Sequence, residues 1–117
     1  MDIFDPTQLG LEAAIRGAGL RQTALAQNIA NANVPGYRRK DVDFHSALAQ
    51  AMTDGQSADG IQFSVQEDPS APTRADGNSV DMDAESAKLA ENGLEYESLV
   101  SVARARIDII EAAMGRA

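Results

Sequence analysis

The sequence predicts a mainly α protein in which two long terminal helices pair as an antiparallel coiled coil. Apolar or small residues recur at steps of four and three near both ends of the chain. Helix start and stop signals bound both runs, and the residues between them are rich in turn formers. We therefore expect helical segments at 1–33 and 81–117. Residues 34–80 are expected to form a turn, a short helix and a flexible connection.

The first helix is expected to begin at Asp5-Pro6. Aspartate is a good N-cap, and proline is tolerated at the first helical position. Six apolar or small residues then form one stripe, and Gln22 is its only polar member. The six are Leu11, Ile15, Ala18, Leu25, Ile29 and Ala32. A helix over residues 7–33 would be about 40 Å long.

The second long helix occupies the last third of the chain. Its predicted stripe also has steps of four and three, and consists of Leu89, Gly93, Tyr96, Val100, Ala103, Ile107, Ile110 and Met114. Asp81, Asp83 and Glu85 crowd its start, where the helix dipole favours negative charge. Its length would be roughly 45–50 Å.

The stretch "NIANANVPGY" at residues 28–37 predicts how the first helix ends. Asn31 and Asn33 are good terminators, because asparagine tolerates the left-handed conformation. Pro35 and Gly36 fit the two central positions of a type II turn. Tyr37 then leaves at a defined angle, from which it can pack over the helix end or onto a neighbour. The basic residues 38–40 follow near the negative end of the helix.

The middle of the chain gives weaker signals. Residues 41–52 favour a short amphipathic helix with Phe44, Leu48 and Met52 on one side. Residues 53–60 are loop by composition, and the alternation in "IQFSV" at 61–65 favours a short strand. Residues 66–79 are turn-rich, and we expect them to be mobile.

Composition argues against several function classes. The net charge is −8, which disfavours nucleic-acid binding. There is no cysteine for a disulfide or thiolate site, and His45 is the only histidine. The acidic cluster at 81–85 lacks the spacing of a calcium loop and favours helix capping instead. No catalytic set can be assembled. We expect no enzyme activity, cofactor, metal or small-molecule substrate.

The sequence also argues against membrane insertion and a cleavable signal. No run of eighteen apolar residues occurs, and the acidic N-terminus has no apolar core of a secretory signal. An amphipathic membrane-surface protein is disfavoured because the helices have acidic starts and no basic flank.

Two kinds of helix packing remain open from the residues alone. The apolar content is largely alanine, and Gly10, Gly17 and Gly19 each cost the first helix about 0.8–1 kcal/mol relative to alanine. The stripes could pair within one molecule, or the segments could complete their packing only in an assembly.

The string "LRQTALAQNIANANVPGYRRKDVDF" resembles the N-terminal signature of the bacterial flagellar axial proteins of the rod and hook. The matching residues are Asn28, Ala30, Asn31, Pro35, Gly36 and Tyr37. Val34 stands where that family usually has threonine. The C-terminal stretches "DGNSVDMDAE" and "LAENGLEYESLV" are similar to the proximal rod proteins, the FlgB family. The likeness covers roughly residues 5–44 and 77–115.

The resemblance implies a structural subunit of the flagellar rod that assembles with itself and other rod proteins. It implies that the terminal helices pair and line the inner tube, and that the turn redirects the chain outward. It also implies export by the flagellar type III apparatus into the periplasmic rod, with membrane-ring and export-gate adaptor proteins as neighbours. The expected assembly residues are Leu11, Ile15, Leu25, Ile29, Asn31, Pro35, Gly36, Tyr37, Leu89, Tyr96, Val100, Ile107, Ile110 and Met114.

A second hypothesis is a soluble helical-hairpin export chaperone or a secreted helical-pair protein that binds one partner. Self-association separates the two. A rod subunit should polymerise or co-assemble, whereas a chaperone should form a small complex with its client.

Overall fold

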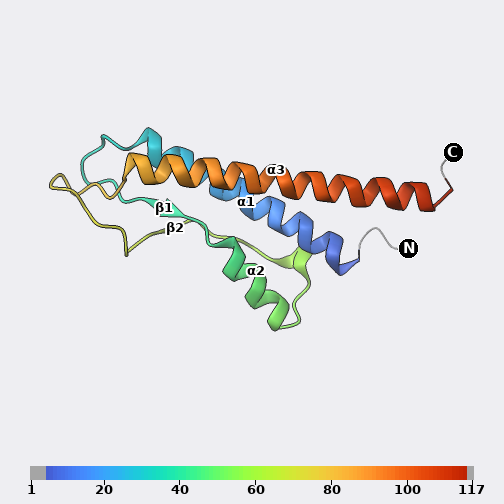
Figure 1. Ribbon diagram of the computed structural model, residues 1–117. Coiled ribbons are helices and arrows are strands. Elements are labelled where there is room, and N and C mark those ends of the chain that lie inside the picture. The colour runs from blue at the N-terminus through green and yellow to red at the C-terminus, as the bar shows by residue number, and fades with distance from the viewer. Residues whose placement is uncertain (1–4, 116–117) are drawn as a thin grey trace.

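The computed structural model describes residues 5–115, and the remaining residues of the two predicted terminal segments lie outside this range. In chain order the elements are α1 (Pro6–Ala30), β1 (Lys40–Asp41), α2 (Phe44–Thr53), a 3₁₀ turn (Ala58–Gly60), β2 (Gln66–Glu67) and α3 (Met82–Ala113). The two long helices lie side by side and run in opposite directions (Figure 1). The mainly α fold with paired terminal helices is therefore confirmed.

Both long helices begin where the sequence places their caps. The Asp5 carboxylate accepts a hydrogen bond from the Gln8 backbone N–H, and Pro6 occupies the first turn. The Asp81 carboxylate accepts hydrogen bonds from the backbone N–H groups of Asp83 and Ala84. Each cap satisfies amide groups that have no partner inside the helix.

Helix α1 ends three residues earlier than predicted. Asn31 is its C-cap, with φ −105° and ψ 16°, so the expected left-handed asparagine is wrong. Positive φ occurs only at glycines among residues 5–115. The Asn31 side-chain amide instead donates to the Gln27 carbonyl at 2.8 Å, which satisfies a carbonyl of the last turn.

Three polar contacts fix the antiparallel register of α1 and α3. Arg106 reaches Gln8, Asn92 reaches Gln22, and Glu85 accepts from Asn28. The residue numbers in these pairs rise along α1 as they fall along α3. Both ends of the described chain consequently lie at the same end of the hairpin, where α3 projects beyond α1 (Figure 1).

The predicted stripe of α3 is partly wrong. Leu89, Ala103 and Ile110 are buried or half-buried as expected, but Ile107 and Met114 are 38% and 71% exposed. Glu85 and Asn92, which a purely apolar stripe excludes, are fully buried. The reason is that groups on α1 offer hydrogen-bond partners to the Glu85 carboxylate and to the Asn92 amide nitrogen.

Helix α2 packs against α1 through Phe44. Phe44 is 1% exposed and sits in a cluster with Ala14, Ala18, Ala24 and Val42. Leu48 packs against that cluster, whereas Met52 is 67% exposed and Ala51 is buried in its place. The predicted helix is confirmed, but the face that it packs against α1 does not include Met52.

The middle segment contains a short strand, as predicted, but this strand does not lie at 61–65. The two-residue strand β2 follows these residues and pairs antiparallel with β1, with Lys40 opposite Glu67 and Asp41 opposite Gln66. Ile61 is buried and Phe63 meets Phe44 edge-on at 6.5 Å between ring centroids. The alternation therefore reflects side-chain packing on the core and not pairing of the backbone.

Candidate functional site

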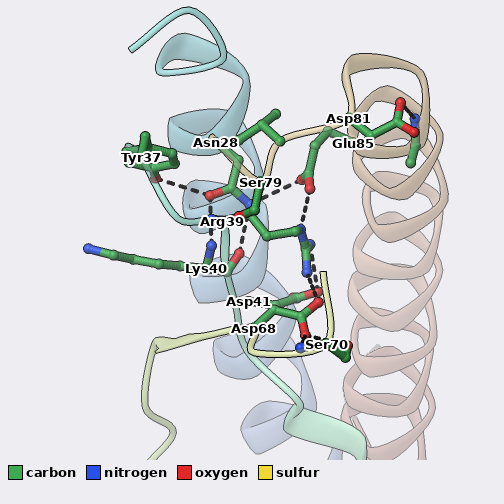
Figure 2. A network of polar contacts seen from close by, with 12 residues as sticks. Asn28, Tyr37, Arg39, Lys40, Asp41, Asp68, Ser70, Ser79, Asp81 and Glu85 are labelled. Carbon is green, nitrogen blue, oxygen red and sulfur yellow. Dashed lines mark hydrogen bonds and ion pairs between the residues drawn. The ribbon is translucent and has the colours of Figure 1, made fainter. Parts of the chain in front are cut away.

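A buried polar network joins the segments at the closed end of the hairpin, where α1 ends and α3 begins (Figure 2). We call it the closed-end network. Its members are the residues labelled in Figure 2, and they come from five parts of the chain. The central residues are Asn28 on α1, Arg39 before β1 and Glu85 on α3. These three residues are 0%, 5% and 1% exposed.

Asn28 uses all of its side-chain hydrogen-bonding capacity. Its amide nitrogen donates to the Lys40 carbonyl at 2.7 Å and to the Glu85 carboxylate at 3.1 Å. Its amide oxygen accepts from the Lys40 N–H at 2.9 Å and from the Tyr37 hydroxyl at 3.1 Å. Tyr37 therefore folds back over the end of α1, one of the two positions predicted for it.

Arg39 links three carboxylates. Its guanidinium bonds Glu85 through Nε, Asp68 through Nη1 at 2.6 Å and Asp41 through Nη2 at 3.1 Å. The backbone of Arg39 also donates to the Ser79 hydroxyl at 2.7 Å and accepts from the Asp68 N–H at 3.0 Å. The charge of Arg39 is thus paired with three carboxylates, of which Asp68 and Glu85 are distant in sequence.

The network shifts the pKa values of its members in opposite directions. Burial alone would lower the pKa of Arg39, but its hydrogen bonds with Glu85 and Asp41 outweigh burial and raise it. Burial would raise the pKa of Asp41, yet hydrogen bonds from Arg21, Val42 and Arg39 lower it overall. Each charged form is thus stabilised by its partners, which is the signature of a paired structural cluster.

The Pro-Gly turn is held by the segment that precedes α3. The Tyr37 N–H donates to the Val34 carbonyl at 3.2 Å, and Gly36 has φ +76°, as a type II turn requires. The Gly36 N–H donates to the Asp76 carbonyl at 2.9 Å. A Cβ atom on Gly77 would lie 3.3 Å from the Gly36 Cα, so the two backbones approach closely.

Asn78 adds further hydrogen bonds between the segment before α3 and the end of α1. It is fully buried, and its amide nitrogen lies within hydrogen-bonding distance of the carbonyls of Asn31, Ala32 and Val34, at 2.7–3.2 Å. Its amide oxygen accepts from the Val80 N–H at 2.7 Å. The stretch "DGNS", predicted as part of a mobile segment, is thus bonded to the stretch "NANVPGY".

The predicted assembly residues divide into three groups by exposure. Leu25 and Ile110 are buried, and Leu11, Ile15, Ile29, Asn31, Tyr37, Leu89 and Val100 are half-buried. Pro35, Gly36, Tyr96, Ile107 and Met114 are exposed. The structure brings Asn31, Pro35, Gly36 and Tyr37 together at the turn, and the others lie along the two helices.

Sequence reasoning missed Asn28, Arg39, Asn78 and Glu85 as centres of the fold. Asn28 was noted only as part of a motif, and Glu85 only as a charge at a helix start. One signal was available: Glu85 stands seven residues before Asn92, and the steps 85, 89, 92 and 96 form a second seam that contains polar residues.

The described residues contain no group of three side chains suited to hold a metal ion. No helix among them is long and apolar enough to cross a bilayer. The fold and its polar network define a class of protein: a helical hairpin whose buried charged groups bind one another and organise the junction of its two long helices.

Comparison with known proteins gives a more specific result. The flagellar basal body rod protein FlgB of Escherichia coli K12 is 31% identical, over 92% of this chain and 91% of its own length. The FlgB proteins of Salmonella typhimurium LT2 and Bacillus subtilis 168 are 31% and 32% identical, over 87% and 86% of this chain. No family model matches the chain. The chain belongs to the FlgB family of flagellar basal body rod proteins.

Proposed function

We propose that this protein is a structural subunit of the proximal rod, which assembles with itself and with other rod proteins through its terminal helices. Membership of the FlgB family supports the rod assignment, since the similarity spans nearly the whole chain. The observation that carries the assembly part is the exposed apolar surface of α3. Leu94, Ile109 and Met114 are 67%, 64% and 71% exposed on a helix that projects past its partner.

Exposed apolar side chains on one projecting helix favour contact with neighbouring subunits. Single exposed apolar residues are common on soluble proteins, but here six of them lie between residues 94 and 114. They are Leu94, Tyr96, Val102, Ile107, Ile109 and Met114. The proposed neighbours are copies of this chain, other rod proteins, and ring or export-gate adaptor proteins at the rod base.

The predicted segments acquire roles under this proposal. The helical regions 1–33 and 81–117 form the inner layer of the rod, and residues 34–80 extend outward from it. The chain reaches the periplasmic rod by flagellar type III export. The turn at Pro35-Gly36 sets the angle at which the chain leaves the inner layer.

Complementation tests this proposal directly. A deletion strain that lacks this chain should be non-motile. When the chain is restored, the strain should regain motility, and its isolated basal bodies should contain complete rods. Purified protein should also form larger assemblies with other rod proteins. A small complex of fixed stoichiometry with one exported client, together with normal rods in the deletion strain, would instead identify a chaperone.

A further inference from the structure

Helix α3 carries two alternative seams that share Leu89, Tyr96, Ala103 and Ile110. One seam is completed by Gly93, Val100, Ile107 and Met114, and we call it the apolar edge. The other is completed by Glu85, Asn92, Leu99 and Arg106, and we call it the polar edge. Burial of apolar surface alone favours the apolar edge.

The structure turns the polar edge inward. Asn92 is 0% exposed while Gly93 is half-buried, and the Arg106 side chain is 31% exposed against 38% for Ile107, whereas Leu99 and Val100 are both half-buried. The end of α1 does not account for this difference, since Ile110 lies farther along α3 and is 2% exposed. Another interaction must therefore oppose the tendency to bury the apolar edge of α3.

Each polar member of this edge bonds to a polar group of α1. The Asn92 amide donates to the Ala18 carbonyl and to the Gln22 side chain, both at 2.8 Å. Arg106 donates to Gln8 at 3.2 Å and to the Asp5 carboxylate at 2.8 Å. Gln22 is the one polar member of the predicted α1 stripe, and it therefore contacts Asn92, the polar residue near the middle of α3.

The Asn92 contact has a cost that apolar packing would not have. Its side-chain oxygen is buried and has no hydrogen-bond partner among residues 5–115. A buried amide in a helix seam stabilises less than an apolar residue but restricts how the helices can pair. This choice of face also brings Leu99 against the core cluster around Phe44.

We propose that Gln22 and Asn92, assisted by Gln8, Asp5 and Arg106, determine which face of α3 is buried against α1. These are specificity-determining residues for helix pairing. They hold α3 so that Leu99 joins the core and two members of the apolar edge, Ile107 and Met114, stay at the surface. The inference concerns the hairpin itself and does not depend on assembly of the rod.

The test changes only α1, so that both edges of α3 remain intact. In the triple variant Asp5→Ser, Gln8→Ala and Gln22→Ala, serine retains an N-cap while the side-chain partners of Arg106 and Asn92 are removed. Each lost hydrogen bond should shift the balance between the two faces by about three- to tenfold. Methyl NOE spectra of the full chain report the face directly.

We expect the NOEs between Leu99 and the Phe44 cluster to weaken, and new NOEs to join Val100 and Ile107 to Leu11 and Ile15. The exposed α1 variant Gln27→Ala is the matched control and should keep the parent pattern. Unchanged Leu99 NOEs in a folded triple variant would overturn the proposal, because contacts other than those of Gln8, Asp5 and Gln22 would then select the face.

A milder variant covers the case in which the triple variant does not fold. Gln22→Met keeps the length of the side chain and removes its acceptor. We expect exchange broadening of the Leu99 and Val100 methyl signals, as both faces become populated. Sharp signals at the parent positions in Gln22→Met would overturn the proposal.

Discussion

Gly36 sets the direction in which the chain leaves α1, because its φ of +76° is a conformation that side chains with a Cβ rarely adopt. No atom lies within 4 Å of where a Cβ would stand, so a substitution there tests backbone strain alone. We expect Gly36→Val to destabilise the protein by about 1–3 kcal/mol. Gly36→Asn should cost less, since asparagine tolerates this region. Urea unfolding of both variants gives the comparison, and equal losses would contradict the turn assignment.

Glu85 is the carboxylate on which the closed-end network depends most. Glu85→Ala leaves the buried Arg39 guanidinium and the Asn28 amide each without one partner. We expect a loss of about 3–5 kcal/mol in the free energy of unfolding. Glu85→Gln keeps the shape and an acceptor, so its loss should be smaller. If Glu85→Ala unfolds at the same urea concentration as the parent, the network does not stabilise the fold.

Asp41 makes stability depend on acid pH. Its pKa in the folded protein lies below the ordinary value of 3.8, so the folded state favours the ionised form. This contribution is fully present above that ordinary value and is lost as the pH falls through the lowered folded pKa. Thermal melts between pH 7 and pH 2 should show stability falling below about pH 4. Asp41→Asn should be less stable near neutral pH and should show a shallower fall.

Among the elements, α2 depends on the absence of a side chain at Gly17. A Cβ atom there would lie 2.8 Å from the Phe44 Cγ, so alanine would push α2 off α1. We expect Gly17→Ala to cost about 1–3 kcal/mol despite the higher helix propensity of alanine. Gly10→Ala is the matched control, because nothing lies within 4 Å of its Cβ position. It should stabilise the protein by up to about 1 kcal/mol, and similar effects of both changes would contradict this packing.

The sequence correctly predicted the features that depend only on neighbouring residues, which are the helix caps and the Pro-Gly turn. The caps Asp5 and Asp81 and the turn at Pro35-Gly36 depend on residues within four positions, and all three were found from sequence. The short strand was placed wrongly at 61–65 because alternation shows only that one side of a segment packs inward. Pairing depends on a partner strand that lies about 25 positions earlier in the chain.

The closed-end network could not be predicted because its contacts join distant residues. Arg39 meets Glu85 across 46 positions, and Asn78 reaches the α1 terminus across 44–47 positions. The seam at 85, 89, 92 and 96 indicates which face of α3 Glu85 lies on, but no periodic pattern identifies Arg39 as its partner. The correct face of α3 was missed for a related reason, since Glu85 and Asn92 enter the seam only because α1 offers them hydrogen-bond partners.

At the scale of the whole molecule, the Cα atoms extend over 62 Å in the longest dimension and only 14 Å in the thinnest. So thin a molecule leaves much of each long helix at the surface. Ile107 and Met114 of the apolar edge are exposed in the single chain, and rod assembly is the proposed use of that surface. A disruptive change on this edge should spare the hairpin and prevent assembly.

Ile107→Asp tests this claim most directly, because Ile107 is 38% exposed and a charge there remains hydrated in the single chain. The matched control is Ser101→Asp, which adds the same charge at an exposed polar position of α3. Both variants should keep the circular dichroism and melting temperature of the parent. In a strain lacking the native chain, electron microscopy of basal bodies should show complete rods with Ser101→Asp and none with Ile107→Asp. Complete rods and full motility with a folded Ile107→Asp protein would contradict the account.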